Sequence, residues 1–381
     1  MNNNISLIGI GKLGICFALN LEGAGYNVLG VDVNQKYVDS INNKTLKSFE
    51  PQVEEMLAKC EKNFHATVLL KDAVEFSDMI FVMVATPSLL NGKYDHSQVD
   101  GIVEQLIAMG KQPNTKYLTI CCTVMPGYSD TVQERLNDYN YIVSYNPEFI
   151  AQGKIIYDQR NPDIILIGEG NTTAGDRLEQ LYGRLCIWTQ NDPVKRMSRK
   201  AAEITKISLN CFITTKIAFA NMIGDIAIDA GVGMEIDKML DAIGSDKRVG
   251  NRCLKYGYGY GGPCFPRDNR ALAIFSNDIG AYSDISKASD RCKTLHFNHQ
   301  FDEMRDAIGF PRGQEVPVVF ESVTYKPGTV ILEESQQLKL ALTLANYGFK
   351  VHIREQSEVI RQLKELYGDI FTYEEKLNET A

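Results

Sequence analysis

The sequence predicts an α/β protein with an N-terminal Rossmann-type doubly wound sheet, a long central helix with a helical middle domain, and a smaller C-terminal α/β domain. Three observations favour this fold class. Strand-like segments alternate with helical ones in the first half of the chain, a long apolar stretch then runs without proline, and strand–helix alternation resumes near the C-terminus. The expected domains are residues 1–195, 196–300 and 301–381.

The first domain opens with "ISLIGIGKLGICFALNLEGAGYNVLGVDVN", which combines a strand, a glycine turn, an amphipathic helix and a second strand. Further buried-type strands follow, and helical stretches such as 99–110 and 129–138 lie between them. These strands are "DMIFVMVATP", "KYLTICCTVMPG", "YIVSYNPEFI" and "DIILIGEG". Strands that alternate with helices in this way predict a parallel, doubly wound sheet.

The middle of the chain has a different character. Residues 198–230 contain no proline, have no glycine before Gly224, and carry apolar residues on nearly every face. Such a helix would be roughly 45 Å long at about 1.5 Å per residue. A helix that is apolar all round needs burial on all sides. We therefore expect it to link domains and to meet the partner subunit of a homodimer.

The C-terminal part predicts a second, smaller sheet. The strand-like segment "VPVVFESVTY" (316–325) is followed by an expected helix over 334–347. The strand "FKVHI" and a helix over 356–366 come next, and the chain stops soon after "DIFTYEEKLNETA". This pattern predicts a short α/β unit.

The composition is that of a globular protein, with 44% hydrophobic residues and a net charge of −8. No block of basic residues is present, so neither nucleic acid nor an anionic membrane is an expected partner. Asn210, Lys216, Asn221 and Asp225 interrupt the most apolar long segment, which argues against a membrane span. Nine cysteines without a CxxC pair favour neither a metal site nor a redox dithiol. Since "MNNNISLIGIG" lacks the features of a secretion signal, we expect reduced thiols in the cytoplasm.

The motif Gly9-x-Gly11-x-x-Gly14 follows the first strand and opens the first helix. Its glycines permit a tight turn, a close approach of the backbone to a pyrophosphate, and close helix–strand packing. Asp32 ends the second strand, 18 residues after Gly14. A carboxylate there accepts hydrogen bonds from ribose hydroxyls and repels a 2′-phosphate, so NAD is favoured over NADP. The alternative is that the glycines serve packing alone.

Cys264 lies in "YGYGYGGPCFPRDNRALA", between a run of glycines and an expected helix. The glycines leave the backbone open to a ligand, and Pro266 suits the first turn of a helix. A thiol beside a helix N-terminus has its thiolate stabilised, and the thiolate is the nucleophile. Asp268 is expected within one turn of it. The alternative is a small buried hydrophobic residue, which is how we interpret the other eight cysteines.

Lys206 and Asn210 are four residues apart on the long expected helix, so they share one face. A cation and an amide on an apolar helix are costly unless satisfied. They could form an oxyanion-binding pair. An internal salt bridge with a capped carbonyl explains them equally well.

Three further polar residues follow expected strands. Glu148 lies in "YNPEFIAQG", where Asn-Pro predicts a turn, and Thr86 and Thr123 occupy corresponding loops. Ligands of doubly wound sheets collect at the carboxyl ends of the strands. These side chains are therefore candidates for a ligand site.

Taken together, these residues resemble the UDP-glucose/GDP-mannose dehydrogenase family over nearly the whole chain. The segments that carry the resemblance are "GYGGPCFPRD", "NPEFIAQG", "AEITKISLNCFITTKIAFANMIGDI", "DKRVGNRCLKYG" and "YKPGT". The resemblance implies oxidation of the C6 alcohol of a nucleotide-sugar to a carboxylate, with two NAD and no metal. It also implies that Cys264 forms a thiohemiacetal and then a thioester, which water hydrolyses.

The resemblance also implies residue roles. Lys206 and Asn210 would stabilise charge on oxygen, Asp268 and Thr123 would position water and protons, and Glu148 would be the base for hydrolysis. The residues expected to contact the nucleotide-sugar are Glu148, Phe149, Ile150, Lys206, Asn210, Arg248, Tyr256, Gly257, Gly261 and Lys326. Those expected to contact the cofactor are Gly9, Gly11, Lys12, Leu13, Gly14, Asp32, Lys36, Tyr37, Thr86, Pro87, Thr123, Gln152 and Arg267.

The sequence departs from the family pattern at several positions. Gln152 stands where many members carry Glu, and Tyr37 where a basic residue is usual. Pro263 and Arg267 replace a common Ser and Lys. In "GTVILEES", Glu333 occupies a usual arginine position, and we expect it to pair with Arg267. The C-terminal domain is also expected to lack its last strand.

These observations favour an NAD-dependent UDP-sugar 6-dehydrogenase that makes UDP-glucuronate from UDP-glucose. UDP-N-acetylhexosamine and GDP-mannose are alternative substrates within the class. A nucleotide-sugar-binding paralogue without turnover is a second reading, and a two-electron 3-hydroxyacid dehydrogenase, which needs no thiol, is a third. The ratio of NADH formed to sugar consumed separates the three readings.

Overall fold

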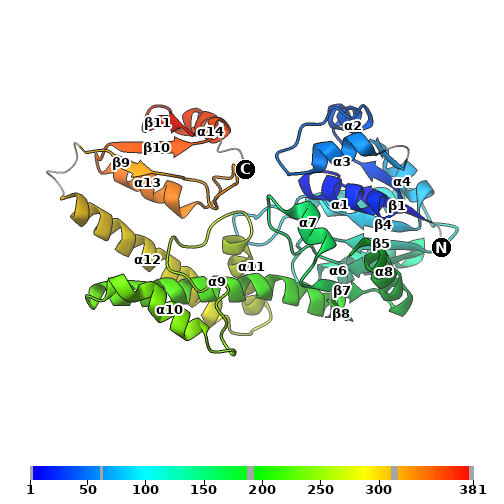
Figure 1. The fold of residues 1–381 in the computed structure, drawn as a ribbon. Helices are drawn as coiled ribbons and strands as arrows, with labels where there is room; N and C mark the ends of the chain where they lie inside the picture. The colour runs from blue at the N-terminus through cyan, green and yellow to red at the C-terminus, as the bar shows by residue number, and fades with distance from the viewer. Residues whose placement is uncertain (1–2, 61–62, 187–192, 310–315, 377–381) are drawn as a thin grey trace. The chain divides into compact units, whose positions relative to one another are not determined.

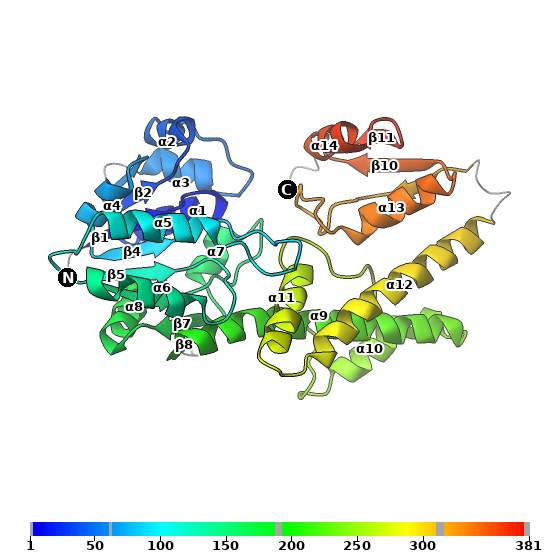
Figure 2. The ribbon, with the colours of Figure 1, turned by 180° about the vertical axis from the view of Figure 1, so that it is seen from behind.

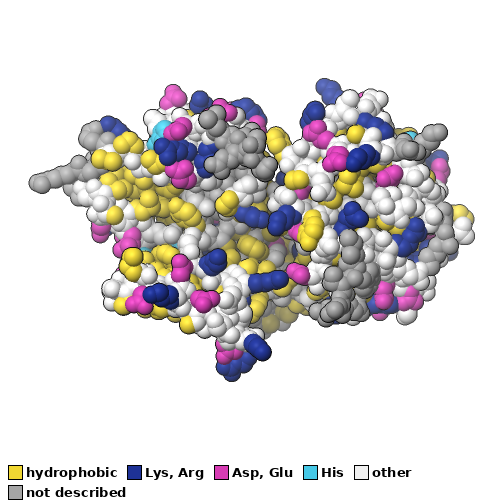
Figure 3. Space-filling view, in the orientation of Figure 1, with side chains coloured by type: hydrophobic (Ala, Val, Ile, Leu, Met, Phe, Trp, Pro, Cys, Tyr) yellow, Lys and Arg dark blue, Asp and Glu magenta, His cyan; other side chains and the backbone are white. Residues whose placement is uncertain are grey.

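The computed structural model describes residues 3–60, 63–186, 193–309 and 316–376. The chain divides into two compact units, Met1–Lys206 and Ile207–Ala381. Lys/Arg and Asp/Glu side chains are interspersed on the face of each unit drawn in Figure 3. This mixture agrees with a sequence that lacks blocks of one charge.

The first unit contains an eight-stranded sheet with the strand order β3-β2-β1-β4-β5-β6-β7-β8. The strands are β1 (Asn4–Ile8), β2 (Asn27–Val31), β3 (Phe64–Thr67), β4 (Met79–Val82), β5 (Lys116–Ile120), β6 (Tyr141–Tyr145), β7 (Ile165–Glu169) and β8 (Val194–Ser198). Neighbouring strands are parallel except β6 and β7, which meet antiparallel at Tyr145 and Gly168. The order of the first six strands confirms the Rossmann-type fold. The expectation of a wholly parallel sheet is wrong at the β6–β7 pair.

Helices cover both faces of this sheet. They are α1 (Lys12–Gly23), α2 (Gln35–Asn42), α3 (Val53–Lys59), α4 (Leu70–Phe76), α5 (Ser97–Ala108), α6 (Tyr128–Leu136), α7 (Ile155–Arg160) and α8 (Thr172–Leu185). One apolar cluster joins the sheet to α1, α2, α3 and α8, and another joins it to α4, α5 and α6. Figure 1 shows α1 in front of the sheet, and Figure 2 shows α5 in front of the opposite face. A sheet buried on both faces explains why its strands are continuous apolar runs.

Helix α9 (Arg199–Asp229) runs across the boundary of the two units and confirms the long central helix. It is only partly covered within the chain. Its exposed large apolar side chains are Leu209, Phe212, Phe219, Met222 and Ile226. Among the described residues it is also the helix whose length and composition would suffice to cross a membrane, a test that core helices of soluble proteins pass as well.

The second unit continues with a helical segment and a small sheet. The helices are α10 (Ile236–Gly244), α11 (Phe265–Asp278) and α12 (Asp284–Ile308). The sheet has the order β11-β10-β9, with β9 (Val318–Phe320), β10 (Val351–Glu355) and β11 (Thr372–Glu375), all parallel. Helices α13 (Gln336–Asn346) and α14 (Ser357–Tyr367) lie on opposite sides of it (Figure 1) and share its apolar core.

Two details of this sheet differ from the sequence-based expectation. The strand expected over 316–325 is confined to β9. The chain turns after β9, where the N–H of Val323 donates to the buried carboxylate of Glu355 at 3.0 Å. The short strand β11, with the sequence "TYEE", has no apolar alternation that would predict it. It is held by backbone pairing with β10 and by an ion pair between Arg354 and Glu374.

Candidate active site

The glycine turn between β1 and α1 has the close contacts that its motif predicts. Gly9 has φ +89°, and a Cβ there would lie 2.7 Å from the carbonyl oxygen of Met83. A Cβ on Gly14 would lie 2.1 Å from the carbonyl oxygen of Gly9. At Gly11 a Cβ would meet open space, directly before α1 begins at Lys12. The turn thus presents open backbone and a helix N-terminus, a combination that binds phosphate.

Asp32 follows the end of β2, and its carboxylate accepts a hydrogen bond from the N–H of Asn34 at 3.0 Å. The hydroxyl of Tyr37 donates to the carbonyl of Ile10, next to the glycine turn, at 2.9 Å. Burial, together with the charge of Asp32, raises the pKa of Tyr37 to about 12. Lys36 is exposed. Tyr37 therefore supports the turn, and Asp32 stays half-buried at the strand end.

Other predicted cofactor residues also lie near strand ends in this unit. Lys12 donates from Nζ to Oε1 of Gln152 at 2.8 Å, which links the glycine turn to the loop after β6. Thr86 donates from Oγ1 to the carbonyl of Thr123 at 2.7 Å, and Pro87 is exposed. Two of the loops named from the sequence, those after β4 and β5, thus make direct contact.

Glu148 and Lys206 form the second grouping in the first unit. Lys206 donates from Nζ to the backbone carbonyl of Glu148 at 2.5 Å and lies 4.3 Å from the ring centroid of Phe149. Burial raises the pKa of Glu148 to about 7, although the charge of Lys206 opposes this shift. A carboxyl group with such a pKa is suited to proton transfer near neutral pH. A backbone carbonyl accepts a hydrogen bond from the buried ammonium of Lys206, which is one half of the structural alternative, a salt bridge with a capped carbonyl, that the sequence also allowed.

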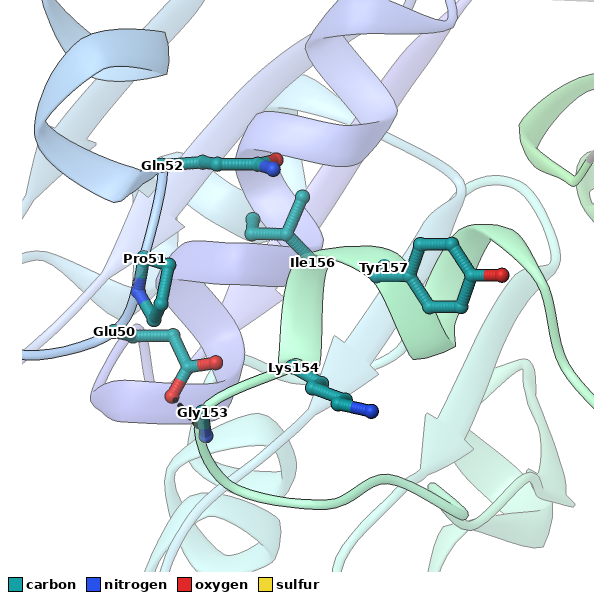
Figure 4. A pocket seen from close by; sticks show the side chains of 7 residues that line it. All are labelled: Glu50, Pro51, Gln52, Gly153, Lys154, Ile156 and Tyr157. Atoms are coloured by element: carbon teal, nitrogen blue, oxygen red, sulfur yellow. Dashed lines mark hydrogen bonds between the residues drawn. The ribbon is translucent and has the colours of Figure 1, made fainter. Parts of the chain in front are cut away.

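A pocket of about 280 Å³ lies beside the loop that carries Gln152 (Figure 4). Its lining consists of Glu50, Pro51, Gln52, Gly153, Lys154, Ile156 and Tyr157. The buried carboxylate of Glu50 accepts hydrogen bonds from the N–H groups of Gly153 at 3.0 Å and Ile155 at 2.7 Å. Glu50 therefore fixes the loop that follows Gln152 and the start of α7. The sequence analysis missed this residue, because its partners lie about a hundred positions away.

In the second unit, Cys264 is exposed and stands at the N-cap of α11. The N–H of Asp268 donates to the carbonyl of Cys264 at 3.0 Å, so the two residues span the first turn. Asn210 donates from Nδ2 to Oδ2 of Asp268 at 2.6 Å. The Asp268 carboxylate is buried, and Nε of Arg267 lies 3.6 Å from its Oδ1. The structure thus brings together Cys264, Asp268, Asn210 and Arg267, four residues named from the sequence.

The glycine loop before Cys264 packs tightly against the segment 325–334. A Cβ on Gly261 would lie 2.5 Å from the carbonyl oxygen of Glu334, and one on Gly262 would lie 2.5 Å from the ring of Tyr325. The N–H of Gly262 donates to the carbonyl of Glu333 at 3.1 Å. Only residues without a side chain fit these contacts. The contacts with segment 325–334 therefore fix the conformation of the glycine loop.

The prediction that Glu333 pairs with Arg267 is wrong, because the described part of the chain shows no ion pair between these two residues. Glu333 is exposed, and its neighbour Glu334 makes the ion pairs instead. Oε1 of Glu334 lies 2.6 Å from Arg270, and Oε2 lies 3.1 Å from Nζ of Lys293. Glu334 has a positive φ of 53°, and its carboxylate meets cations on two other helices, Arg270 on α11 and Lys293 on α12.

Of the remaining residues predicted to bind the sugar, two are hydrogen-bonded to α9, and the others are exposed or half-buried. Tyr256 donates from its hydroxyl to Asp225 at 3.2 Å, and Gly257 donates from its N–H to Oδ1 of Asn221 at 3.1 Å. Arg248 is paired with Asp246 and has an 89% exposed side chain. Lys326 is also exposed, and Ile150 is half-buried after β6.

Comparisons with known proteins point to one family. A model of the UDP-glucose/GDP-mannose dehydrogenase family, NAD binding domain, matches residues 3–186, and a model of the family's central domain matches residues 200–293. The UDP-glucose 6-dehydrogenase of Pseudomonas aeruginosa is 29% identical over 362 residues, which cover 92% of this chain and 78% of that protein. The GDP-mannose 6-dehydrogenase of Pseudomonas syringae pv. tomato is 28% identical and covers 92% and 80%.

Comparison with solved structures points to the same family. The structure of a UDP-glucose dehydrogenase from the hyperthermophilic archaeon Pyrobaculum islandicum matches with a TM-score of 0.87 and 28% identity, over 98% of this chain and 86% of that chain. The glycine turn suits NAD, because Gly11 leaves room for a pyrophosphate and Asp32 directly follows the second strand. The chain belongs to the UDP-glucose/GDP-mannose dehydrogenase family, whose members are NAD-dependent nucleotide-sugar dehydrogenases.

Proposed function

We propose that the protein oxidises UDP-glucose to UDP-glucuronate by a four-electron reaction in which Cys264 is the nucleophile. The observation that carries the proposal is the placement of Cys264 at the N-cap of α11, one turn before a buried carboxylate that Asn210 holds. A purely structural cysteine has no need of an exposed helix N-terminus. We choose UDP-glucose because a UDP-glucose 6-dehydrogenase of Bacillus subtilis matches over 99% of this chain and the structure of a UDP-glucose dehydrogenase matches over 98% of it, whereas the GDP-mannose 6-dehydrogenase of Pseudomonas syringae pv. tomato matches over 92%.

The reaction balances with water as the further reactant. NAD, when bound, accepts the hydride that leaves C6 in each of the two oxidations. The first oxidation converts the alcohol to an aldehyde and releases a proton. The Cys264 thiolate then forms a C–S bond to C6, the second hydride leaves, and a thioester results. Water attacks the thioester, the C–S bond breaks, and the uronate and free thiol are released.

The other residues transfer protons, stabilise charge or position groups of the site. Glu148 is the base that removes a proton from the attacking water, and its pKa of about 7 suits that work. Lys206 and Asn210 stabilise negative charge on the oxygen at C6. Asp268 holds Asn210 in position through the 2.6 Å hydrogen bond. Thr123 positions the water.

We also propose a homodimer that uses α9. Leu209, Phe212, Phe219 and Ile226 follow one another at intervals of three, seven and seven residues along this helix, and all four are exposed in the single chain. Such a stripe is typical of a helix that packs against another helix. Light scattering coupled to size-exclusion chromatography should give a dimer for the natural chain and a monomer for Phe212→Glu. A monomeric natural chain at micromolar concentration would contradict this part.

The substrate is tested by NADH formation with UDP-glucose, GDP-mannose and UDP-N-acetylmannosamine. We expect the fastest turnover with UDP-glucose and two NADH for each uronate formed. One NADH per sugar would support a two-electron dehydrogenase, and binding of a nucleotide-sugar without NADH would support a non-catalytic paralogue.

The nucleophile is tested by Cys264→Ala. The matched control is Cys292→Ala, since Cys292 is a half-buried cysteine on α12. We expect Cys264→Ala to abolish uronate formation while NAD binds as before, and Cys292→Ala to remain active. Uronate production by Cys264→Ala at near the natural rate would refute the covalent mechanism.

A further inference from the structure

The N–H and the carbonyl of Gly257 are both hydrogen-bonded to side chains of helices, and two of these side chains, Asn221 and His296, are buried. Its N–H donates to Oδ1 of Asn221 on α9 at 3.1 Å. Its carbonyl lies 2.7 Å from Nε2 of His296 and accepts from Nε2 of Gln300 at 3.3 Å, both on α12. The backbone of this one glycine therefore makes three hydrogen bonds with side chains of two helices, one through its N–H and two through its carbonyl.

His296 is buried, with 2% of the residue exposed. Its Nδ1 lies 2.8 and 2.9 Å from the two carboxylate oxygens of Asp225. The ring of Tyr256 packs edge-on against the imidazole, with 5.4 Å between ring centroids. Asp225 also accepts the hydroxyl hydrogen bond of Tyr256. The imidazole is thus locked between α9 and the loop, and it has one orientation available.

The donor and acceptor inventory fixes the proton on Nε2. A backbone carbonyl can only accept, so the 2.7 Å contact with Gly257 requires an N–H on Nε2. Nδ1 faces a carboxylate, so a proton also lies between Nδ1 and Asp225. This arrangement makes His296 a directed donor to one carbonyl.

We propose that His296 is a positioning residue for the nucleotide-sugar: through its Nε2–H it fixes the Gly257 carbonyl and thereby the loop that leads to Cys264. The inference rests on the proposed function, in which Gly257 contacts the sugar. Glycines at 257, 259, 261 and 262 give this loop a large conformational entropy in the absence of restraints. A restraint at Gly257 acts at the start of that flexible run, whereas the contacts of Gly261 and Gly262 with segment 325–334 restrain its end.

A requirement of packing alone does not explain the imidazole. A polar ring in a buried site costs free energy unless each of its polar atoms is satisfied, and an apolar side chain of the same size would avoid that cost. Here both nitrogens are satisfied, one by Asp225 and one by the loop. The ring therefore couples a helix carboxylate to the position of one backbone carbonyl.

A pair of amide variants separates the two nitrogens. The amide nitrogen of Gln in His296→Gln can take the place of Nε2 and still donate to Gly257. The shorter Asn in His296→Asn places its amide near Nδ1, so it can reach Asp225 but not Gly257. His299→Gln is the matched control, because His299 lies one turn along α12 and its Nδ1 lies 3.4 Å from the same Asp225, whereas its Nε2 contacts Asp229 at 3.1 Å instead of Gly257.

Steady-state kinetics give the first measurement. We expect His296→Asn to raise KM for UDP-glucose about tenfold, which is the loss of one well-formed hydrogen bond, with kcat changed less than about threefold. His296→Gln and His299→Gln should keep KM within about threefold of the natural protein, and NAD binding by calorimetry should be the same in all four proteins. Equal KM values for His296→Asn and His296→Gln would overturn the proposal, even if both variants are less stable.

Nuclear magnetic resonance gives a measurement that needs neither turnover nor a folded His296 variant. The protein has five histidines, and single substitutions of the other four assign the ¹⁵N signals of His296 in a selectively labelled sample. We expect Nε2 of His296 to carry a proton that exchanges slowly with solvent. An Nε2 without a proton would overturn the inference. If the natural protein oxidises no nucleotide-sugar while Nε2–H is observed, the proposed function fails and the role of His296 at the sugar fails with it, whereas its hold on Gly257 stands.

Discussion

Asn210 on α9 donates a hydrogen bond from Nδ2 to Oδ2 of Asp268 on α11, over 2.6 Å. The carboxylate is 1% exposed and lies one turn from Cys264, to whose carbonyl its own N–H donates. The hydrogen bond joins two helices of the second unit at the residue that we propose as the nucleophile. It is also a hydrogen bond to a charged acceptor, a class that contributes about 1.5–3 kcal/mol.

Exchanging the two side chains tests this bond. Asn210→Asp should lower the free energy of unfolding by about 1–3 kcal/mol, because it sets two carboxylates face to face. The double variant Asn210→Asp/Asp268→Asn restores one amide and one carboxylate, so it should recover most of that loss in urea denaturation. Its NADH formation should stay low, since the charge has moved to the other helix. A double variant no more stable than Asn210→Asp would show that the pair is not coupled.

Glu148 should make stability depend on pH. Its carboxyl has an ordinary pKa of 4.5, and burial raises the pKa to about 7 in the folded chain. The folded state therefore binds the proton more tightly, so the charged form costs stability above pH 7 and this cost vanishes as the pH falls toward 4.5. Glu148→Gln should be more stable than the natural protein at pH 8 and about equal at pH 5, as measured by urea denaturation.

The same variant should be slow in hydrolysis. Loss of a general base typically costs about 10²–10⁴ in rate. Intact-protein mass spectrometry after mixing with NAD and UDP-glucose should show a nucleotide-uronyl adduct on Cys264. Fast uronate release by Glu148→Gln, without an adduct, would assign the base to another residue.

Cofactor choice should depend on Asp32. Asp32 directly follows β2, and the next residue, Val33, is 96% exposed, whereas Tyr37 is half-buried and donates to the carbonyl of Ile10. Asp32→Gly combined with Val33→Arg removes the carboxylate and adds a cation without disturbing Tyr37. We expect this variant to shift the ratio of kcat/KM values toward NADP, because a guanidinium pairs well with a 2′-phosphate. An unchanged NAD/NADP ratio at equal pH and salt would show that Asp32 does not contact the ribose.

The adjacent acids Glu333 and Glu334 should behave differently. Burial tends to raise the pKa of Glu334, but its hydrogen bond with Arg270 and the charge of Lys293 outweigh burial and lower it. A lowered folded pKa stabilises the protein above the ordinary value of 4.5, and this stabilisation is lost as the pH falls through the folded value.

Glu334→Gln should therefore lower the free energy of unfolding by about 1 kcal/mol at pH 7 and leave it unchanged in strong acid. The value at pH 7 is small because solvent screens this partly exposed carboxylate. Glu333→Gln is the control, because its side chain is exposed, and it should stay within about 0.5 kcal/mol of the natural protein. Equal effects of the two variants at pH 7 would contradict the assigned ion pairs.

The sequence by itself was sufficient for the features that depend on local chemistry. The strand–turn–helix of residues 4–23 follows from apolar periodicity, from the positive φ that favours glycine at Gly9, and from Gly14, where a Cβ would collide with the carbonyl of Gly9. Helix α9 follows from its long run without proline, and the N-cap position of Cys264 follows from Pro266 two residues later. Each of these depends on neighbours within a few residues, so their pattern is readable along the chain.

Only the tertiary structure decided which distant groups meet. The sequence offered Glu333 as the partner of a cation, but it is the carboxylate of Glu334 that meets Arg270 and Lys293. Glu50 and His296 carried no motif, and they hold backbone groups 103 and 39 residues away. Hydrogen bonds of this kind depend on where the packed helices and strands place a donor and an acceptor. That placement is set by burial of the apolar faces of many elements together, and no local spacing records it.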